Sequence, residues 1–155
     1  MCISWRQNVH SPNPHSKLRT YKLFKQNHGR EPYLKIRNFA YRKHLTKFRI
    51  SAHSLEIEYG RRRNIPVEER ICKHCTMNNN IEDESHFVLK CPLYVNERNS
   101  MYHNIIKECK SFGNMSDQNK FVYLMTSEND NVFNAVATFV HNSWKIRANA
   151  NQPCS

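Results

Sequence analysis

Residues 71–91 read ICKHCTMNNNIEDESHFVLKC and contain the spacing C-x2-C-x10-H-x4-C. Two residues between Cys72 and Cys75 allow one tight turn to direct both thiolates toward a common point. His86 and Cys91, separated by four residues, can converge on that point from one helical turn or its end. The spacer TMNNNIEDES, with three consecutive asparagines, has the composition of a loop. The stretch therefore predicts a metal site with four protein ligands.

Three thiolates and one imidazole suit Zn²⁺, and four protein ligands leave no open position for catalysis. The expected cofactor is a structural Zn²⁺, whose coupled folding can contribute on the order of 10 kcal/mol. Three other interpretations stay open. The cysteines are buried as small hydrophobic residues, Cys72 and Cys75 form a redox pair, or His74 replaces His86 as a ligand.

Three acidic residues, Glu82, Asp83 and Glu84, precede His86. One of them is a candidate to accept the second imidazole proton of His86 as an outer-shell partner. The alternative is that they form a solvated acidic turn, or the first turn of a helix that carries His86.

The rest of the chain predicts helices joined by short connections. The expected helices cover residues 17–28, 31–36, 38–50, 92–113 and 130–147, with a further one that Ser116 caps and that contains 121–125. Residues 52–59 favour a helix ended by Gly60, with a strand as the alternative. The predicted fold is mostly α, a small helical domain stapled by a CCHC zinc knuckle. Its expected parts are a disordered linker (1–15), a basic helical region (16–70), the zinc-binding unit with the following helix (71–113), a C-terminal helical pair (114–148) and a disordered tail (149–155).

The net charge of +11 is concentrated in one half of the chain. Residues 1–71 hold 16 Lys or Arg and five Asp or Glu, whereas residues 72–155 hold eight of each. Such a field attracts polyanions, of which nucleic acid is the usual one. The alternative is a basic surface that serves only solubility.

The expected partner is therefore RNA or DNA, held through its phosphates. The predicted phosphate contacts are Arg42, Lys43, Lys47, Arg49, Arg61, Arg62 and Arg63, with Lys17, Arg19, Lys22 and Lys25 as a second row. Tyr41 and Tyr59 are candidates for stacking on unpaired bases, although an aromatic residue at helical spacing is more often part of the core.

No apolar run approaches the length of a membrane span, and the N-terminal residues do not resemble a signal peptide. We therefore expect a nuclear or cytoplasmic protein that is not secreted, with reduced thiols, no membrane contact and no small-molecule substrate.

The cysteine and histidine pattern, followed by Pro92, resembles the CCHC motif near the C-terminus of reverse transcriptases from non-LTR retrotransposons. Further stretches are similar to the same region of these elements. They are residues 16–75, from SKLRTYKLFKQ to ICKHC, the second half of the motif, IEDESHFVLKCPLYVNER, and the closing KFVYLMTSENDNVFNAVATFVHNSWKIR. The resemblance spans about residues 16–148. It implies that Cys72, Cys75, His86 and Cys91 bind zinc in a module that holds template RNA or target DNA during reverse transcription.

The chain departs from that family where catalysis is concerned. Asp occurs only at positions 83, 117 and 130, and no Tyr/Phe-x-Asp-Asp sequence is present. A polymerase needs such carboxylates to hold two metal ions. The nuclease pattern of a Pro-Asp pair followed by an acidic-x-Lys segment is also missing. We therefore expect no enzyme activity. The alternatives are a zinc-stapled helical module that binds an acidic protein partner, and a retroelement relic without a present role.

Overall fold

The computed structural model describes residues 16–18, 20–25, 28–75 and 80–151. The linker expected at 1–15, the last residues of the expected tail and residues 76–79 at the start of the asparagine-rich spacer lie outside the described residues. No helix in the described part of the chain has the length and apolar character needed to cross a membrane.

The described residues form helices and contain one isolated antiparallel β-bridge, between Ile71 and Ile81. The α-helices are α2 (Tyr21–Phe24), α3 (Phe39–Arg49), α4 (Glu56–Arg61), α5 (Glu84–Leu89), α6 (Val95–Glu108), α7 (Asp117–Thr126) and α8 (Asp130–Ala150). Short 3-10 helices connect them: η1 (Pro32–Lys35), η2 (Val67–Glu69), η3 (Pro92–Tyr94) and η4 (Lys110–Asn114). The predicted mostly helical fold is confirmed.

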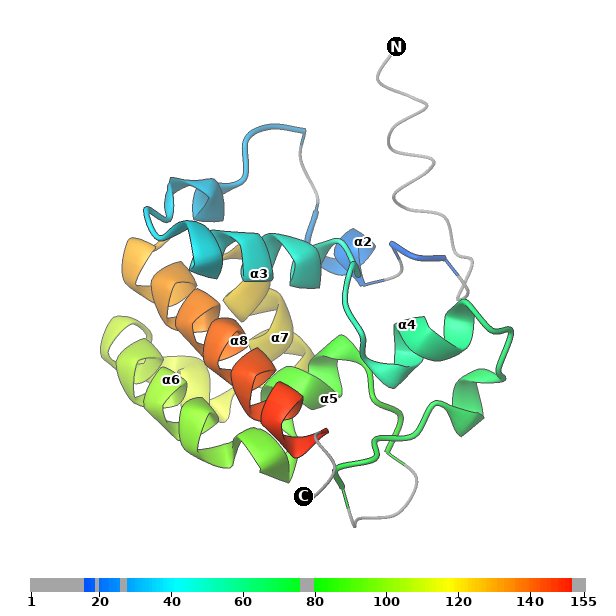
Figure 1. Ribbon diagram of the computed structural model, residues 1–155. Coiled ribbons are helices and arrows are strands. Elements are labelled where there is room, and N and C mark those ends of the chain that lie inside the picture. Colours follow the sequence, from blue (N-terminus) through cyan, green and yellow to red (C-terminus); the bar gives the residue numbers. More distant parts are fainter. Residues whose placement is uncertain (1–15, 19, 26–27, 76–79, 152–155) are drawn as a thin grey trace.

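Helix α8 is the centre of the packing. It lies between α3 and α6 and contacts both (Figure 1). Its apolar stripe is buried, with Val136, Ala137 and Val140 fully enclosed. Residues from each of the ranges 16–70, 71–113 and 114–148 enter the same hydrophobic core, so these segments pack on one another through shared apolar contacts.

Polar residues start the longer helices. The side chain of Asn38 accepts from the backbone N–H groups of Ala40 and Tyr41 at the start of α3. Ser116 caps α7 as predicted, and Asn129 caps α8 in the same way. Each such cap satisfies backbone donors that have no partner within the helix and is worth about 1 kcal/mol.

Among the described residues of 17–28, only Tyr21–Phe24 (α2) is α-helical, so the extent expected for this helix is wrong. Lys25 leaves the helical conformation, and its side chain turns inward. Its ammonium group donates to the carbonyl of Gly29 at 3.0 Å and pairs with Glu31 at 2.5 Å. Because of these contacts, the chain leaves the helical conformation at Lys25, although the apolar spacing predicts that the helix continues.

The sequence predicts that Gly60 ends a helix over residues 52–59, and this prediction is wrong. Helix α4 starts at Glu56 and continues through Gly60 to Arg61. A Cβ atom at Gly60 would lie 2.6 Å from the Cγ atom of Arg70. The glycine is needed because the buried Arg70 side chain crosses it to reach the carbonyl groups of Ile57 and Ile65.

A buried ion pair joins α8 to the segment before α5. The guanidinium group of Arg147 donates to both carboxylate oxygens of Glu82, with an Nη2···Oε2 distance of 2.9 Å. Both side chains are almost fully buried. The hydrogen bonds and the charge of Glu82 raise the pKa of Arg147, although burial alone would lower it. The guanidinium therefore stays charged and neutralises a carboxylate inside the core.

We expect Arg147→Met to lower the free energy of unfolding by about 3–5 kcal/mol, because it leaves the carboxylate of Glu82 buried without a cation. The control is Lys145→Met, which removes an exposed cation from the same helix and should change stability by no more than about 0.5 kcal/mol. Chemical denaturation of the metal-loaded proteins measures both. Equal losses in the two variants would contradict the assignment.

Two histidines connect α3 and α8. The Nδ1 atoms of His44 and His141 lie 3.0 Å apart, and the rings stack at a centroid distance of 4.8 Å. One ring must donate and the other accept, so at least one of them is neutral. Burial lowers the pKa of both, and the positive charge of Lys145 lowers both further.

Because these folded-state pKa values lie below that of an unfolded histidine, the unfolded chain binds more protons as pH falls. The contribution of these two histidines to stability is therefore fully present above about pH 6.5 and is lost as pH falls below that value. We expect His44→Asn to reduce this loss between pH 7 and pH 5. Denaturation midpoints of both proteins across this range test the expectation. Both proteins contain the metal cluster, so the cluster does not cause a difference between them. An identical dependence of the midpoint on pH in the two proteins would contradict the expectation.

Candidate metal centre and basic face

The four residues singled out by the CCHC spacing meet at one point in the structure. One ligand atom from each of Cys72, Cys75, His86 and Cys91 lies within 4.8 Å of the others. Cys75 Sγ lies 3.8 Å from Cys91 Sγ and 3.2 Å from His86 Nε2, and Cys72 Sγ lies 3.9 Å from Cys91 Sγ. His74 is not part of this cluster.

These separations match a tetrahedron around one ion. Sulfur atoms about 2.3 Å from a common centre at the tetrahedral angle lie about 3.8 Å apart. The observed sulfur distances of 3.8 and 3.9 Å are close to that value. All four cysteines in the described residues, these three and Cys109, are free thiols. The arrangement is therefore compatible with a metal-binding staple.

Backbone contacts bring Cys72 next to the strand-like segment before α5. The Ile71–Ile81 bridge closes the two ends of the spacer on each other. The N–H group of Cys72 donates to the carbonyl of Asn80 at 2.9 Å, and that of Glu82 donates to the carbonyl of Arg70 at 2.8 Å. These backbone hydrogen bonds hold the two ends of the spacer together, so the length of the spacer does not separate Cys72 from the ligands that follow it.

Helix α5 presents the other two ligands. Asp83 caps it by accepting from the backbone N–H group of His86 at 2.7 Å. After Leu89 the chain turns sharply, and the N–H groups of Lys90 and Cys91 both donate to the carbonyl of His86 at 2.9 Å. This turn brings the thiol of Cys91 close to the imidazole of His86.

The acidic residues before His86 do not serve as its outer-shell partners. Glu82 binds Arg147, Asp83 caps α5, and no described residue accepts a hydrogen bond from the buried Nδ1 of His86. As one of the two alternatives predicted, Glu84 lies in the first turn of the helix that carries His86, although its side chain is buried and not solvated. Packing, rather than a carboxylate, orients the imidazole.

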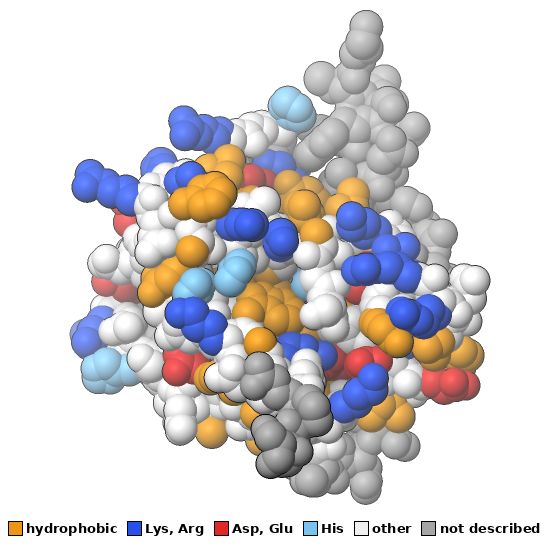
Figure 2. All heavy atoms as spheres, in the orientation of Figure 1, with side chains coloured by type: hydrophobic (Ala, Val, Ile, Leu, Met, Phe, Trp, Pro, Cys, Tyr) orange, Lys and Arg blue, Asp and Glu red, His pale blue; other side chains and the backbone are white. Residues whose placement is uncertain are grey.

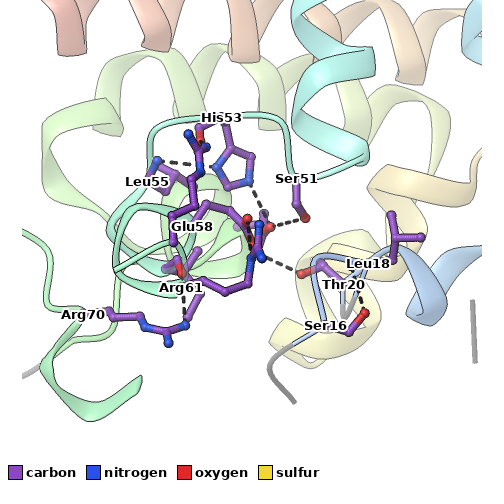
Figure 3. A network of polar contacts seen from close by, with 12 residues as sticks. Ser16, Leu18, Thr20, Ser51, His53, Leu55, Glu58, Arg61 and Arg70 are labelled. Carbon is purple, nitrogen blue, oxygen red and sulfur yellow. Dashed lines mark hydrogen bonds and ion pairs between the residues drawn. The ribbon is translucent and has the colours of Figure 1, made fainter. Parts of the chain in front are cut away.

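Glu84 instead joins three segments in a buried polar network. Its carboxylate accepts from the hydroxyl groups of Thr20 and Ser51, and lies 2.9 Å from His53 Nε2 (Figure 3). The backbone N–H group of Leu55 donates to His53 Nδ1, so the proton of the neutral ring is on Nε2. Ser51 contacts the carboxylate and not the imidazole, so this is a structural network and not a nucleophile with its base.

The three thiols of the cluster differ in the direction of their pKa shifts. A hydrogen bond with Cys91 and burial raise the pKa of Cys72, and burial raises that of Cys75. The contact from Cys72 lowers the pKa of Cys91. Two of the three thiols thus hold their protons without a metal, and a bound cation would favour all three thiolates.

Arg98 closes the end of α5 close to the cluster. It is buried on α6 and donates to the carbonyl groups of Val88 and Cys91 at 2.7 Å, and to that of Phe87 at 3.4 Å. These bonds satisfy carbonyl groups that the short helix leaves without partners. They also place a positive charge beside the ligand segment.

The predicted phosphate contacts divide into inner and outer groups. Arg49 is 4% exposed, pairs with Glu31 at 2.7 Å, donates to the carbonyl of Met125 and lies over the ring of Tyr33. The structure therefore corrects the expectation that Arg49 contacts phosphate, because its guanidinium joins α3 to α7 inside the protein.

Arg61 is also committed to an internal contact. Its Nε atom donates to the carboxylate of Glu58 at 2.9 Å, and that carboxylate is fully buried (Figure 3). Removing Arg61 would take a cation away from a buried carboxylate and so disturb the fold, which makes Arg61 an unsuitable site at which to test nucleic-acid binding.

The other predicted contacts belong to α3 and to the end of α4, and Figure 2 shows Lys and Arg side chains spread over these two helices. Lys43, Lys47, Arg62 and Arg63 are exposed, and none forms an ion pair with a described carboxylate. Arg42 is half-buried and donates to the carbonyl of Ile36 at 2.6 Å. The structure thus brings cations from two separate segments to one face.

Aromatic rings accompany these cations. Phe39 is 66% exposed, with the guanidinium group of Arg42 5.7 Å from its ring centre and the ammonium group of Lys43 at 6.0 Å. Tyr59 is 38% exposed, and the guanidinium group of Arg63 lies 3.7 Å from its ring centre. The other predicted stacking residue, Tyr41, packs against His141 with a centroid distance of 4.5 Å.

The sequence prediction missed Phe39, Arg98, Trp144 and Arg147. For Arg98 and Arg147 a signal was present, since each is a charged residue on an otherwise apolar stripe, where only a buried partner makes it tolerable. Phe39 is the first residue of the basic helix α3 and does not lie on the apolar stripe of that helix. Trp144 has no such signal, because it continues the apolar stripe of α8.

The chain matches no model of a known protein family, no curated protein and no solved structure.

We expect Cys91→Ser to lower the free energy of unfolding of the Zn²⁺-treated protein by at least about 3 kcal/mol, because metal binding adds directly to folding stability. Hydrogen exchange should rise in residues 71–91. Cys109→Ser is the control, since Cys109 lies outside the cluster. A chelator should reduce the stability of the native chain and of the control but not that of Cys91→Ser. Equal chelator sensitivity of all three would contradict the ligand assignment.

Proposed function

We propose that this chain is a nucleic-acid-binding module whose helical fold is stapled by a structural Zn²⁺. Its four ligands are Cys72, Cys75, His86 and Cys91. We further propose that it is a remnant of the C-terminal tail of a non-LTR retrotransposon reverse transcriptase, without the catalytic residues of a polymerase or nuclease. The observation that carries the proposal is the face on which exposed cations of α3 and α4 lie beside exposed aromatic rings.

The choice of Zn²⁺ rests on the donors and their spacing. Three sulfur atoms and one nitrogen atom are soft ligands, and a closed set of four in a tetrahedron is typical of structural zinc sites. The sulfur separations of 3.8 and 3.9 Å agree with Zn–S bonds of about 2.3 Å. The protein supplies the whole coordination sphere, so the ion would contribute stability rather than chemistry.

The basic face supports a polyanionic partner. Lys43, Lys47, Arg62 and Arg63 are exposed and unpaired by any described carboxylate, so they would bind phosphates without first breaking an ion pair. Binding releases the counterions that surround nucleic acid, which makes affinity salt-dependent. Neighbouring aromatic rings are typical of surfaces on which unpaired bases stack.

Kinship with retroelement reverse transcriptases rests on the resemblance of residues 16–148, above all the CCHC spacing followed by Pro92. The role implied is to hold template RNA or target DNA. The polymerase chemistry would belong to other parts of such a protein, because this chain lacks the paired aspartates that hold catalytic metals.

We expect the double variant Arg62→Gln/Arg63→Gln to weaken binding to single-stranded RNA of any sequence. The slope of log affinity against log salt should flatten by about 1.4 for two lost phosphate contacts. The matched control is Lys107→Gln/Lys110→Gln, which removes the same charge from exposed positions on α6 and η4. Filter binding over a salt series measures both.

Equal salt slopes in the two double variants would contradict the proposed interface. A chain that binds an acidic peptide but no nucleic acid at physiological salt would instead favour a protein-interaction module.

A further inference from the structure

A pocket of about 370 Å³ opens between α3, α4 and α8. Its wall includes His44 and Lys47 of α3, His53 of the following loop, Arg62 at the end of α4, and Trp144 of α8. No described Asp or Glu lines it. The pocket thus combines the largest aromatic side chain with two exposed cations, at the centre of the basic face.

We propose that this pocket binds one unpaired base of a single-stranded nucleic acid, with Trp144 against the base and with Lys47 and Arg62 on the adjoining phosphates. This inference rests on the proposed function and sharpens it. A base inside a duplex is stacked on both faces, so only an unpaired or extruded base can enter such a pocket.

The aromatic wall is formed before any ligand arrives. The indole ring of Trp144 packs nearly parallel to Phe87, with a centroid distance of 5.0 Å and an interplanar angle of 27°. It also lies 6.2 Å from the ring of His53 at 30°. Because these contacts fix its orientation, little side-chain entropy remains to be lost on binding.

The cation at the mouth is held in the same way. Arg62 donates to the backbone carbonyl of His53 at 3.0 Å. The ring of His53 is in turn fixed by Glu84 and by the N–H group of Leu55. One histidine therefore positions both the indole and the guanidinium.

Size and charge agree with a nucleotide. The volume is at the small end of the range for ligand pockets, with room for a base and its sugar but not for a folded element. Lys47 and Arg62 lie on different elements at the same pocket, so a strand that places its base here passes between two phosphate contacts.

The test uses the full-length chain with Trp5→Phe, so that Trp144 is the remaining tryptophan. The probes are a single-stranded 12-nucleotide oligouridylate, the corresponding oligothymidylate, and a 12-base-pair duplex. Either single strand should quench the fluorescence of Trp144, and the duplex should not. In otherwise native chains, Trp144→Leu should weaken single-strand binding about tenfold or more, whereas Trp144→Phe should retain most of it.

Lys47→Gln should weaken single-strand binding severalfold, and Lys107→Gln should not. Thermal melting identifies any variant that fails to fold, and the fluorescence of the unaltered Trp144 remains a readout in that case. If the single strands and the duplex all bind but the fluorescence of Trp144 does not change, the pocket assignment is wrong. The proposal for the basic face would then still stand. Failure to bind any of the three probes would overturn the proposed function itself.

Discussion

Glu82 joins three parts of the fold through one residue. Its carboxylate binds Arg147 of α8 and the backbone N–H group of Glu56 at the start of α4, and its carbonyl accepts from the N–H group of Ile57. Cys72 Sγ lies 3.4 Å from the same carboxylate. The CCHC cluster and the ion pair therefore lie side by side. Both fix the position of the segment before α5, against which α4 and α8 are placed.

Arginine serves two purposes in this protein. Arg49, Arg70, Arg98 and Arg147 are buried, and each donates to backbone carbonyl groups, to a carboxylate, or to both. A guanidinium group suits this role because its planar donors reach several acceptors at once. Lys43, Lys47, Arg62 and Arg63 are exposed and form no ion pair with a described carboxylate, although Arg62 also donates to the carbonyl of His53. The surface that we propose for nucleic acid is therefore built from the cations that the interior does not use.

The proposed binding face depends on the same scaffold. The loop after α3 carries His53, which reaches Glu84 on one side and holds Arg62 on the other. Glu84 starts the helix that presents His86 and ends before Cys91. The metal cluster and the pocket beside Trp144 are thus two ends of one connected polar and aromatic network.

Local pattern alone determined much of this protein. The CCHC spacing identified the four residues that converge, apolar periodicity gave α3, α6 and α8, and Ser116 marked the start of α7. These features depend on neighbours a few residues apart, which a sequence displays directly. Tertiary structure decided which cations are free. Arg49 and Arg62 look alike in the sequence, yet one is enclosed by Glu31 and Met125 and the other lines an open pocket. It also ended helix α2 at Phe24, because Lys25 contacts Gly29 and Glu31 beyond the helix, and it left Trp144 half-buried in the wall of a pocket beside the loop after α3. Such outcomes depend on contacts between distant segments, whose free energy outweighs local propensity and which no short pattern encodes.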